Sequence, residues 1–206
     1  MIAHLFFKFK VYFNYRSKAV NAHGLHSPFL FDFYNEVIAA KKEFYFFKQF
    51  RGLLSAYTKF ISEADALFLY RWVAFYQPNS VFVASENFPA SLALAVPSNK
   101  KILSVSSLCH FSNQELNIFE GLGVSLSEDY HADLIYLEEI DSSTKDIILN
   151  YKCVIIKKPH QNEPKNDIWK ELCSLKDISI SIDLFQFGIL LVDKKISKQH
   201  FVVKMR

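Results

Sequence analysis

Glycine is scarce in this chain, which has five glycines among its 206 residues. None of them falls in "VFVASENFPASLALAV", residues 81–96, where a short apolar strand runs through a turn into a helix. Glycine lets a backbone approach a ligand closely, and nucleotide-binding α/β proteins place glycines at this kind of turn. This turn therefore excludes a glycine-rich phosphate loop of the usual type.

Cysteine is also rare. Cys109, Cys153 and Cys173 are far apart and form no Cys-x-x-Cys pair, and their odd number argues against a disulfide framework. No stretch approaches the roughly 20 apolar residues that a membrane-spanning helix needs. The first residues lack the apolar core and the cleavage site of a signal peptide. We therefore expect a soluble protein in a reducing, cytoplasmic compartment.

Charge is nearly balanced over the whole chain, and the net charge of +3 is too small to argue for a nucleic-acid partner. Its distribution is uneven, because the first 60 residues hold nine Lys or Arg against three Asp or Glu. The same 60 residues hold 17 of the 33 aromatic residues. We therefore predict that residues 1–60 form a helical N-terminal extension and residues 61–206 the main domain.

From residue 80 onward, short apolar strands alternate with helices. This alternation predicts an α/β fold with a mostly parallel sheet that is covered on both faces. In "ISISIDLFQFGILLVDKK" two strands are joined too tightly for a crossover helix, so the closing strands are predicted to be antiparallel. Ser62 with Asp65, Ser112 with Glu115, and Ser27 with Pro28 mark three helix starts. Strands are expected at 81–84, 102–105, 134–137, 153–157, 178–184, 188–192 and 200–204, and helices at 43–57, 89–96, 113–122, 143–150 and 165–174.

Three stretches carry a family resemblance: "NAHGLHSPFLFDFYNEV"; "HADLIYLEEID" followed by "YKCVIIKKPHQNEPKNDIWKEL"; and "SIDLFQFGILLVDKKISKQHFVVK". In these stretches the chain resembles class I S-adenosylmethionine-dependent methyltransferases, in particular a bacterial group with a helical N-terminal extension. The resemblance implies a Rossmann-like methyltransferase sheet of about seven strands, mostly parallel with antiparallel closing strands. It also implies S-adenosylmethionine as the cofactor.

The sequence departs from this family where the family binds its cofactor. Val83 and Ser85 stand near the expected acidic residue and glycine, and Ser106 stands near the carboxylate that usually meets the ribose. Lys157 and Lys158 stand where relatives often carry paired aspartates. These departures predict a degenerate cofactor site in a pseudoenzyme that acts as a binding or scaffold module.

Two alternatives stay open, and with them the question whether the chain is an enzyme. The first is an active methyltransferase for a small molecule, with a rebuilt pocket in which Glu86 or Glu138 bonds the ribose. The candidate rim residues are Ser85, Glu86, Asn87, Ser106 and Glu138, and no catalytic residue or metal ligand is assigned. The second is a peripheral membrane or partner-docking protein that uses the basic aromatic segment 6–16. That segment would otherwise pack on the main domain or on a second copy in a homo-oligomer.

Other polar residues receive structural interpretations. His23 and His26 have no third metal ligand nearby, so we expect a local role at the helix start. We favour a solvated connection for the loop 157–167 over an acid–base site formed by its residues His160, Glu163 and Asp167. For the acidic cluster Glu138, Glu139 and Asp141 we favour a role at a helix entry over a divalent-cation site.

Overall fold

The computed structural model describes residues 2–21, 24, 27–41, 44–54, 60–106, 110–193 and 196–205. It divides the chain into two units. Residues 26–132 form one, which we call the central unit, and residues 1–25 together with 133–206 form the other, which we call the terminal unit. The predictions for His23, His26 and Cys109 lie outside the described residues. The boundary at residue 60 stays a prediction.

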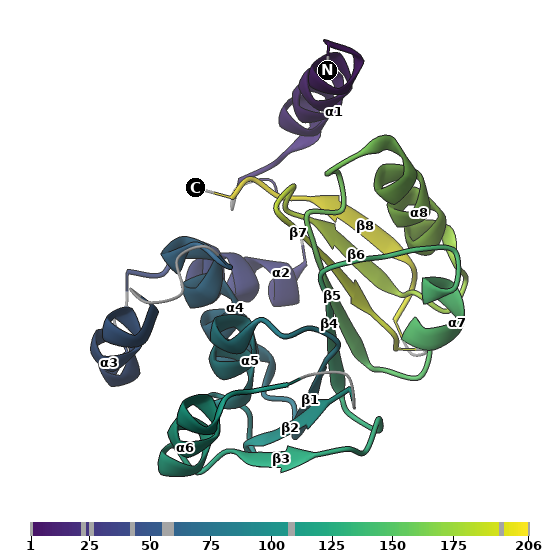
Figure 1. The fold of residues 1–206 in the computed structure, drawn as a ribbon. Coiled ribbons are helices and arrows are strands. Elements are labelled where there is room, and N and C mark those ends of the chain that lie inside the picture. Colours follow the sequence, from purple (N-terminus) through teal and green to yellow (C-terminus); the bar gives the residue numbers. More distant parts are fainter. Residues whose placement is uncertain are drawn as a thin grey trace. The chain divides into compact units, whose positions relative to one another are not determined.

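The central unit begins with helices and ends with parallel strands (Figure 1). Its strands lie in the order β3-β2-β1, and all of them are parallel. The elements are α2 (Pro28–Phe33), the π-helix η2 (Tyr34–Ile38), α3 (Tyr45–Leu54), α4 (Glu63–Tyr76), β1 (Ser80–Val83), α5 (Phe88–Ala95), β2 (Ile102–Val105), α6 (Asn113–Gly121) and β3 (Ser125–Ser127).

Helix caps in the central unit follow the sequence pattern. The Ser62 hydroxyl accepts a hydrogen bond from the Asp65 backbone N–H at 3.1 Å at the start of α4. Ser112 and Glu115 form the predicted capping box at the start of α6. Ser27 occupies the predicted cap position before α2, but its side chain makes no capping hydrogen bond. The three predicted helix starts are therefore confirmed, and one of them lacks the side-chain bond.

Aromatic side chains from the first half of the chain fill the core of the central unit. Phe33, Phe47 and Phe50 are fully buried, and so is Trp72 on α4. The Phe33 and Trp72 rings meet edge to face with centroids 5.0 Å apart, a favoured geometry for aromatic pairs. Part of the aromatic excess in residues 1–60 is thus explained by packing.

The terminal unit contains the other strands and a long N-terminal helix (Figure 1). Its strands lie in the order β4-β5-β7-β6-β8. β4 and β5 are parallel, β7 is antiparallel to both β5 and β6, and β8 is parallel to β6. The elements are α1 (Ile2–Lys18), β4 (Leu134–Leu137), α7 (Thr144–Ile148), β5 (Cys153–Lys157), α8 (Glu163–Ser174), β6 (Ile180–Asp183), β7 (Phe187–Leu191) and β8 (Gln199–Val202). The α/β class, the mostly parallel strands and the antiparallel closing pair are confirmed.

Two boundaries differ from the predictions for physical reasons. α8 begins at Glu163, two residues early, because the Asn162 side chain caps it by accepting from the Lys165 N–H at 3.0 Å. The three-residue strand β3 was not predicted, because Ser125 and Leu126 are exposed and show no apolar alternation. No helix among the described residues has the length and apolar character needed to cross a membrane.

Candidate functional site

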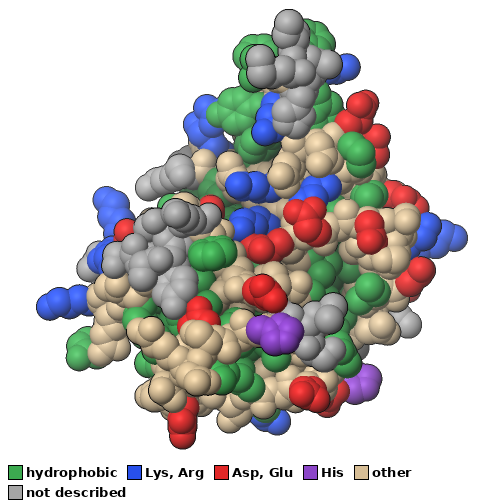
Figure 2. All heavy atoms as spheres, viewed as in Figure 1, with side chains coloured by type: hydrophobic (Ala, Val, Ile, Leu, Met, Phe, Trp, Pro, Cys, Tyr) green, Lys and Arg blue, Asp and Glu red, His purple; other side chains and the backbone are tan. Residues whose placement is uncertain are grey.

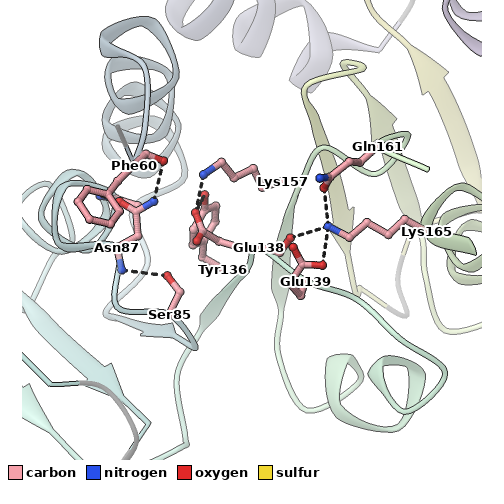
Figure 3. Close-up of polar contacts among 10 residues, drawn as sticks. Phe60, Ser85, Asn87, Tyr136, Glu138, Glu139, Lys157, Gln161 and Lys165 are labelled. Carbon is pink, nitrogen blue, oxygen red and sulfur yellow. Dashed lines mark hydrogen bonds and ion pairs between the residues drawn. The ribbon is translucent and has the colours of Figure 1, made fainter. Parts of the chain in front are cut away.

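Asn87 closes the loop that follows β1 in the central unit. Its side chain is 4% exposed, and its Oδ1 accepts a hydrogen bond from the Ala90 N–H at 3.1 Å at the start of α5. Its Nδ2 donates to the Phe60 carbonyl at 3.3 Å, and its own N–H donates to the Ser85 hydroxyl at 3.3 Å (Figure 3). The helix N-terminus, which can bind anions when its N–H groups are free, is therefore capped from within the chain.

The next residue, Phe88, fills the space beside this loop. Its side chain is 2% exposed, and its ring meets Phe119 and Phe111 at centroid distances of 5.1 and 6.2 Å. Pro89 follows and fixes the first turn of α5. A buried, aromatic, proline-rigid turn replaces the small residues with which a backbone approaches a ligand.

Glu86 and Ser106 are the remaining rim candidates of the central unit. The Glu86 side chain is 66% exposed, and its Oε1 lies 3.7 Å from the exposed His110 Nδ1. Ser106 is half-buried and follows β2 directly. The carboxylate of Glu86 points into solvent, where charge interactions are weak.

Glu138, the fifth rim candidate, belongs to the terminal unit, where it follows β4. Its Oε1 lies 2.6 Å from the Nζ of Lys157 at the end of β5, and it accepts a hydrogen bond from the Tyr136 hydroxyl at 3.2 Å (Figure 3). The Glu138 side chain is 25% exposed and that of Lys157 is 13% exposed. The carboxylate that a ribose would need is therefore already occupied by an ammonium group of the same unit.

A second lysine, Lys165, closes the segment after β4. Its Nζ donates to the Glu138 carbonyl at 3.0 Å and to Gln161 Oε1 at 2.8 Å, and lies 2.8 Å from Glu139 Oε2 (Figure 3). Lys165 is 4% exposed although it carries a charge. Three acceptors around one buried ammonium group compensate for its lost hydration.

Asp141 takes the predicted role at a helix entry. Its Oδ1 accepts from the Ser143 N–H at 2.9 Å and from the Ser143 hydroxyl at 2.6 Å, just before α7. These bonds from Ser143 lower the pKa of the Asp141 carboxyl. The helix-entry interpretation is confirmed for Asp141, whereas Glu138 and Glu139 bind lysines instead.

The loop 157–167 is not the solvated connection that we favoured. His160 is 8% exposed, and its Nε2 lies 2.8 Å from Oδ2 of Asp183 at the end of β6. Its Nδ1 lies 2.8 Å from Oδ1 of Asn166. Glu163 and Asp167 are exposed, and Asp167 binds Lys170 on the helix surface. The structure therefore does not bring His160, Glu163 and Asp167 together, and it buries His160 with partners that sequence spacing did not indicate.

Both nitrogens of His160 are occupied in this cluster. The Asn166 amide donates from Nδ2 to Asp167 Oδ1 at 3.3 Å, which turns its oxygen toward the histidine. The Phe185 ring stacks on the imidazole with centroids 5.4 Å apart. With neither nitrogen left over, the histidine is a structural anchor rather than a general base.

A cavity of about 620 Å³ lies in the terminal unit between α1 and the loops that follow β5 and β6. Its wall is largely aromatic and aliphatic, with two lysines. The lining residues are Leu5, Lys8, Phe9, Tyr12, Lys158, His160, Gln161, Phe185 and Gln186. This volume falls in the range of small-molecule sites.

Metal ligands do not gather in the part of the chain that the structure describes. No group of three or more His, Cys, Asp or Glu side chains there is arranged to hold a metal ion. Burial raises the pKa of the Cys173 thiol to about 12, so this cysteine stays protonated at neutral pH.

No protein-family model matches this chain, and no curated protein sequence matches it. Two solved structures are similar in fold. The O-methyltransferase from Bacillus cereus in complex with SAH matches with a TM-score of 0.49 and 9% identity, over 74% of this chain and 93% of that one. A proposed O-methyltransferase from Klebsiella pneumoniae matches with a TM-score of 0.48 and 10% identity, over 75% of this chain and 93% of that one. Both are described as methyltransferases, the family that the sequence resembles.

Proposed function

We propose that this protein is a methyltransferase-like binding or scaffold module that does not use S-adenosylmethionine. The observation that carries the proposal is the closure of the loop after β1. Asn87 satisfies the N-terminus of α5 with its own side chain, and the buried Phe88 packs beside it. A cofactor placed there as the family places it would have to displace both side chains, so the residues present do not fit it.

The strand ends of the terminal unit support the same proposal. An enzyme that binds a ribose or a metal at these ends needs carboxylates with free lone pairs. Here Glu138 is neutralised by Lys157, and Glu139 is joined to the buried Lys165. Removing either lysine from its carboxylate to admit a ligand would cost the energy of a partly buried ion pair.

Calorimetric titration of the full chain with S-adenosylmethionine and with S-adenosylhomocysteine tests this proposal. We expect no heat of binding up to millimolar ligand. Micromolar binding of either compound would overturn the proposal and favour the active enzyme with a rebuilt pocket. Circular dichroism of the same sample establishes that the titrated protein is folded.

Two variants locate any binding that does appear. Glu86→Gln removes the exposed carboxylate after β1, and Glu171→Gln removes an exposed carboxylate from α8 as a matched control. Binding that weakens roughly tenfold only in Glu86→Gln would place the ribose at Glu86.

A further inference from the structure

Helix α1 is fixed to the terminal unit along one side. Tyr15 is 6% exposed, and its hydroxyl donates to the Val203 carbonyl at 2.7 Å. The Tyr12 and Tyr15 rings meet the Phe185 ring at centroid distances of 5.1 and 5.2 Å. Just beyond the helix, the backbone of Val20 pairs with that of Val203. These contacts set which side of α1 faces the protein and which faces outward.

The outward side of α1 is apolar. Leu5, Phe6, Phe9 and Phe13 are 71%, 70%, 68% and 68% exposed. Their spacing of three and four residues places them on one side of the helix. Isolated exposed apolar residues are ordinary, whereas four large ones side by side mark a surface that contacts something apolar. We call these four residues the outer face of α1.

Positive charge flanks the outer face. α1 carries Lys8, Lys10, Arg16 and Lys18 and no acidic residue. Lys8 lies one turn from Leu5 on one border, and Lys10 lies one turn from Phe6 and Phe13 on the other. Figure 2 shows hydrophobic and basic side chains together over α1. An apolar strip between lysines is the pattern of a helix that lies in the interface of an anionic membrane.

The cavity beside α1 continues this surface into the protein. Leu5 and Phe9 belong both to the outer face and to the cavity wall, and Lys8 faces Lys158 across the same cavity list of lining residues. In the part of the chain that the structure describes, neither Lys8 nor Lys158 forms an ion pair. Two unpaired ammonium groups in one aromatic cavity provide a place for an anionic group.

The backbone on the far wall of this cavity is strained. Lys158 and Phe185 have φ angles of +47° and +66°, which are unfavourable for residues with a side chain and most of all for a bulky one. The Lys158 N–H donates to the Gln186 carbonyl at 2.7 Å and holds this geometry. Strain of this kind is concentrated at ligand-binding loops.

We propose that the terminal unit docks on an anionic phospholipid surface through the outer face of α1, with a lipid headgroup phosphate between Lys8 and Lys158. The acyl-chain region covers Leu5, Phe6, Phe9 and Phe13. A second copy of the chain is a poorer occupant, because a symmetric contact through the same face would place two sets of four cations together. This inference is independent of whether the cofactor binds.

The test is sedimentation of the full chain with vesicles. One set contains phosphatidylcholine alone, and the other contains phosphatidylcholine with phosphatidylglycerol. We expect partitioning onto the anionic vesicles only, and we expect it to weaken as salt is raised. Free inorganic phosphate at millimolar concentration should not compete, because it lacks the acyl chains that contact the outer face.

Matched variants separate this surface from general stickiness. Phe9→Ser with Phe13→Ser should weaken partitioning by roughly a hundredfold, about tenfold for each aromatic ring. Tyr45→Ser removes an aromatic residue that is 88% exposed on α3 and should have no effect. Lys158→Gln should reduce the preference for anionic vesicles roughly fivefold, and Lys176→Gln, an exposed lysine in the same unit, should not.

Three outcomes would overturn the proposal. The first is the absence of partitioning onto anionic vesicles. The second is equal partitioning of the wild type and the Phe9→Ser, Phe13→Ser variant. The third is a dimer in size-exclusion chromatography that this variant dissociates, which would assign the outer face to a second copy. Equal effects of Lys158→Gln and Lys176→Gln would overturn the headgroup site alone.

Discussion

The Nζ of Lys157 lies 2.6 Å from Oε1 of Glu138, so the end of β5 neutralises the segment that follows β4. The two strands are parallel and paired from Leu134 with Cys153 to Leu137 with Ile156, which brings their carboxyl ends together. The lysine that looked like a reversal of charge in the sequence is therefore half of an internal ion pair. Both side chains are largely removed from water, so each depends on the other.

We expect Glu138→Gln to destabilise the protein. The substitution leaves the Lys157 ammonium group, 13% exposed, without its carboxylate, at a cost of about 1–3 kcal/mol in the free energy of unfolding. Urea denaturation measures this cost. The double variant Glu138→Gln, Lys157→Met should recover most of it, because it removes the unpaired charge.

The control for this prediction is Glu171→Gln. Glu171 pairs with Lys145 at 3.3 Å, but both side chains are about half exposed, so little stability should be lost. Equal urea midpoints for Glu138→Gln and Glu171→Gln would show that the Glu138 pair behaves as a surface pair.

Local patterns predicted much of the fold. Strands β4 and β5 have the predicted limits, because each is a short run of buried apolar residues. The cap at Ser112 was evident because Glu115 follows it at the spacing of a capping box. Signals of this kind lie within a few residues of each other along the chain.

The candidate site was harder to predict, because its contacts join distant residues. Nothing in the neighbourhood of His160 indicates that Asp183, 23 residues later, will lie 2.8 Å away. Lys165 looked like a surface residue, but acceptors at Glu138 and Gln161 allow its burial. The closure of the loop by Asn87 was foreshadowed only by the lack of glycine, since its bond to the Phe60 carbonyl spans 27 residues.

Asn87→Ala should destabilise α5. It removes the acceptor for the Ala90 N–H, and loss of such a cap costs about 1 kcal/mol. The loss should appear as a lower urea midpoint with an unchanged slope. Ser27→Ala is the matched control, because Ser27 holds the cap position of α2 without a capping hydrogen bond and should change the midpoint little. A larger loss in Ser27→Ala than in Asn87→Ala would contradict this account of the loop.

Gly188→Ala should be strongly destabilising. A Cβ at Gly188 would lie 2.5 Å from the Trp169 ring, and Trp169 is 2% exposed and has no room to move. Overpacking of this kind costs about 1–3 kcal/mol or more. Gly121→Ala, at the end of α6, has nothing within 4 Å of the new Cβ and should be neutral or slightly stabilising. Thermal unfolding of the two variants measures the difference, and a similar midpoint for both would mean that α8 shifts freely.

Tyr15 should make stability depend on pH in the alkaline range. Burial raises the pKa of its hydroxyl to about 12, whereas the unfolded chain ionises near 10. The folded state therefore holds its proton longer, so the stabilisation is complete below pH 10 and is lost as the pH rises toward 12. The total is on the order of 2–3 kcal/mol, from about two pKa units at 1.36 kcal/mol each.

Tyr15→Phe tests this dependence and the attachment of α1 together. At pH 8 the variant should lose about 1 kcal/mol, because the Val203 carbonyl loses its donor. Between pH 8 and pH 11.5 the stability of the wild type should fall more steeply than that of the variant, so the two urea curves converge. Tyr45→Phe, at a residue that is 88% exposed, should follow the wild type at both pH values. Parallel curves for Tyr15→Phe and the wild type would show that the hydroxyl is not held against Val203, and α1 would then lack its main polar attachment to the terminal unit.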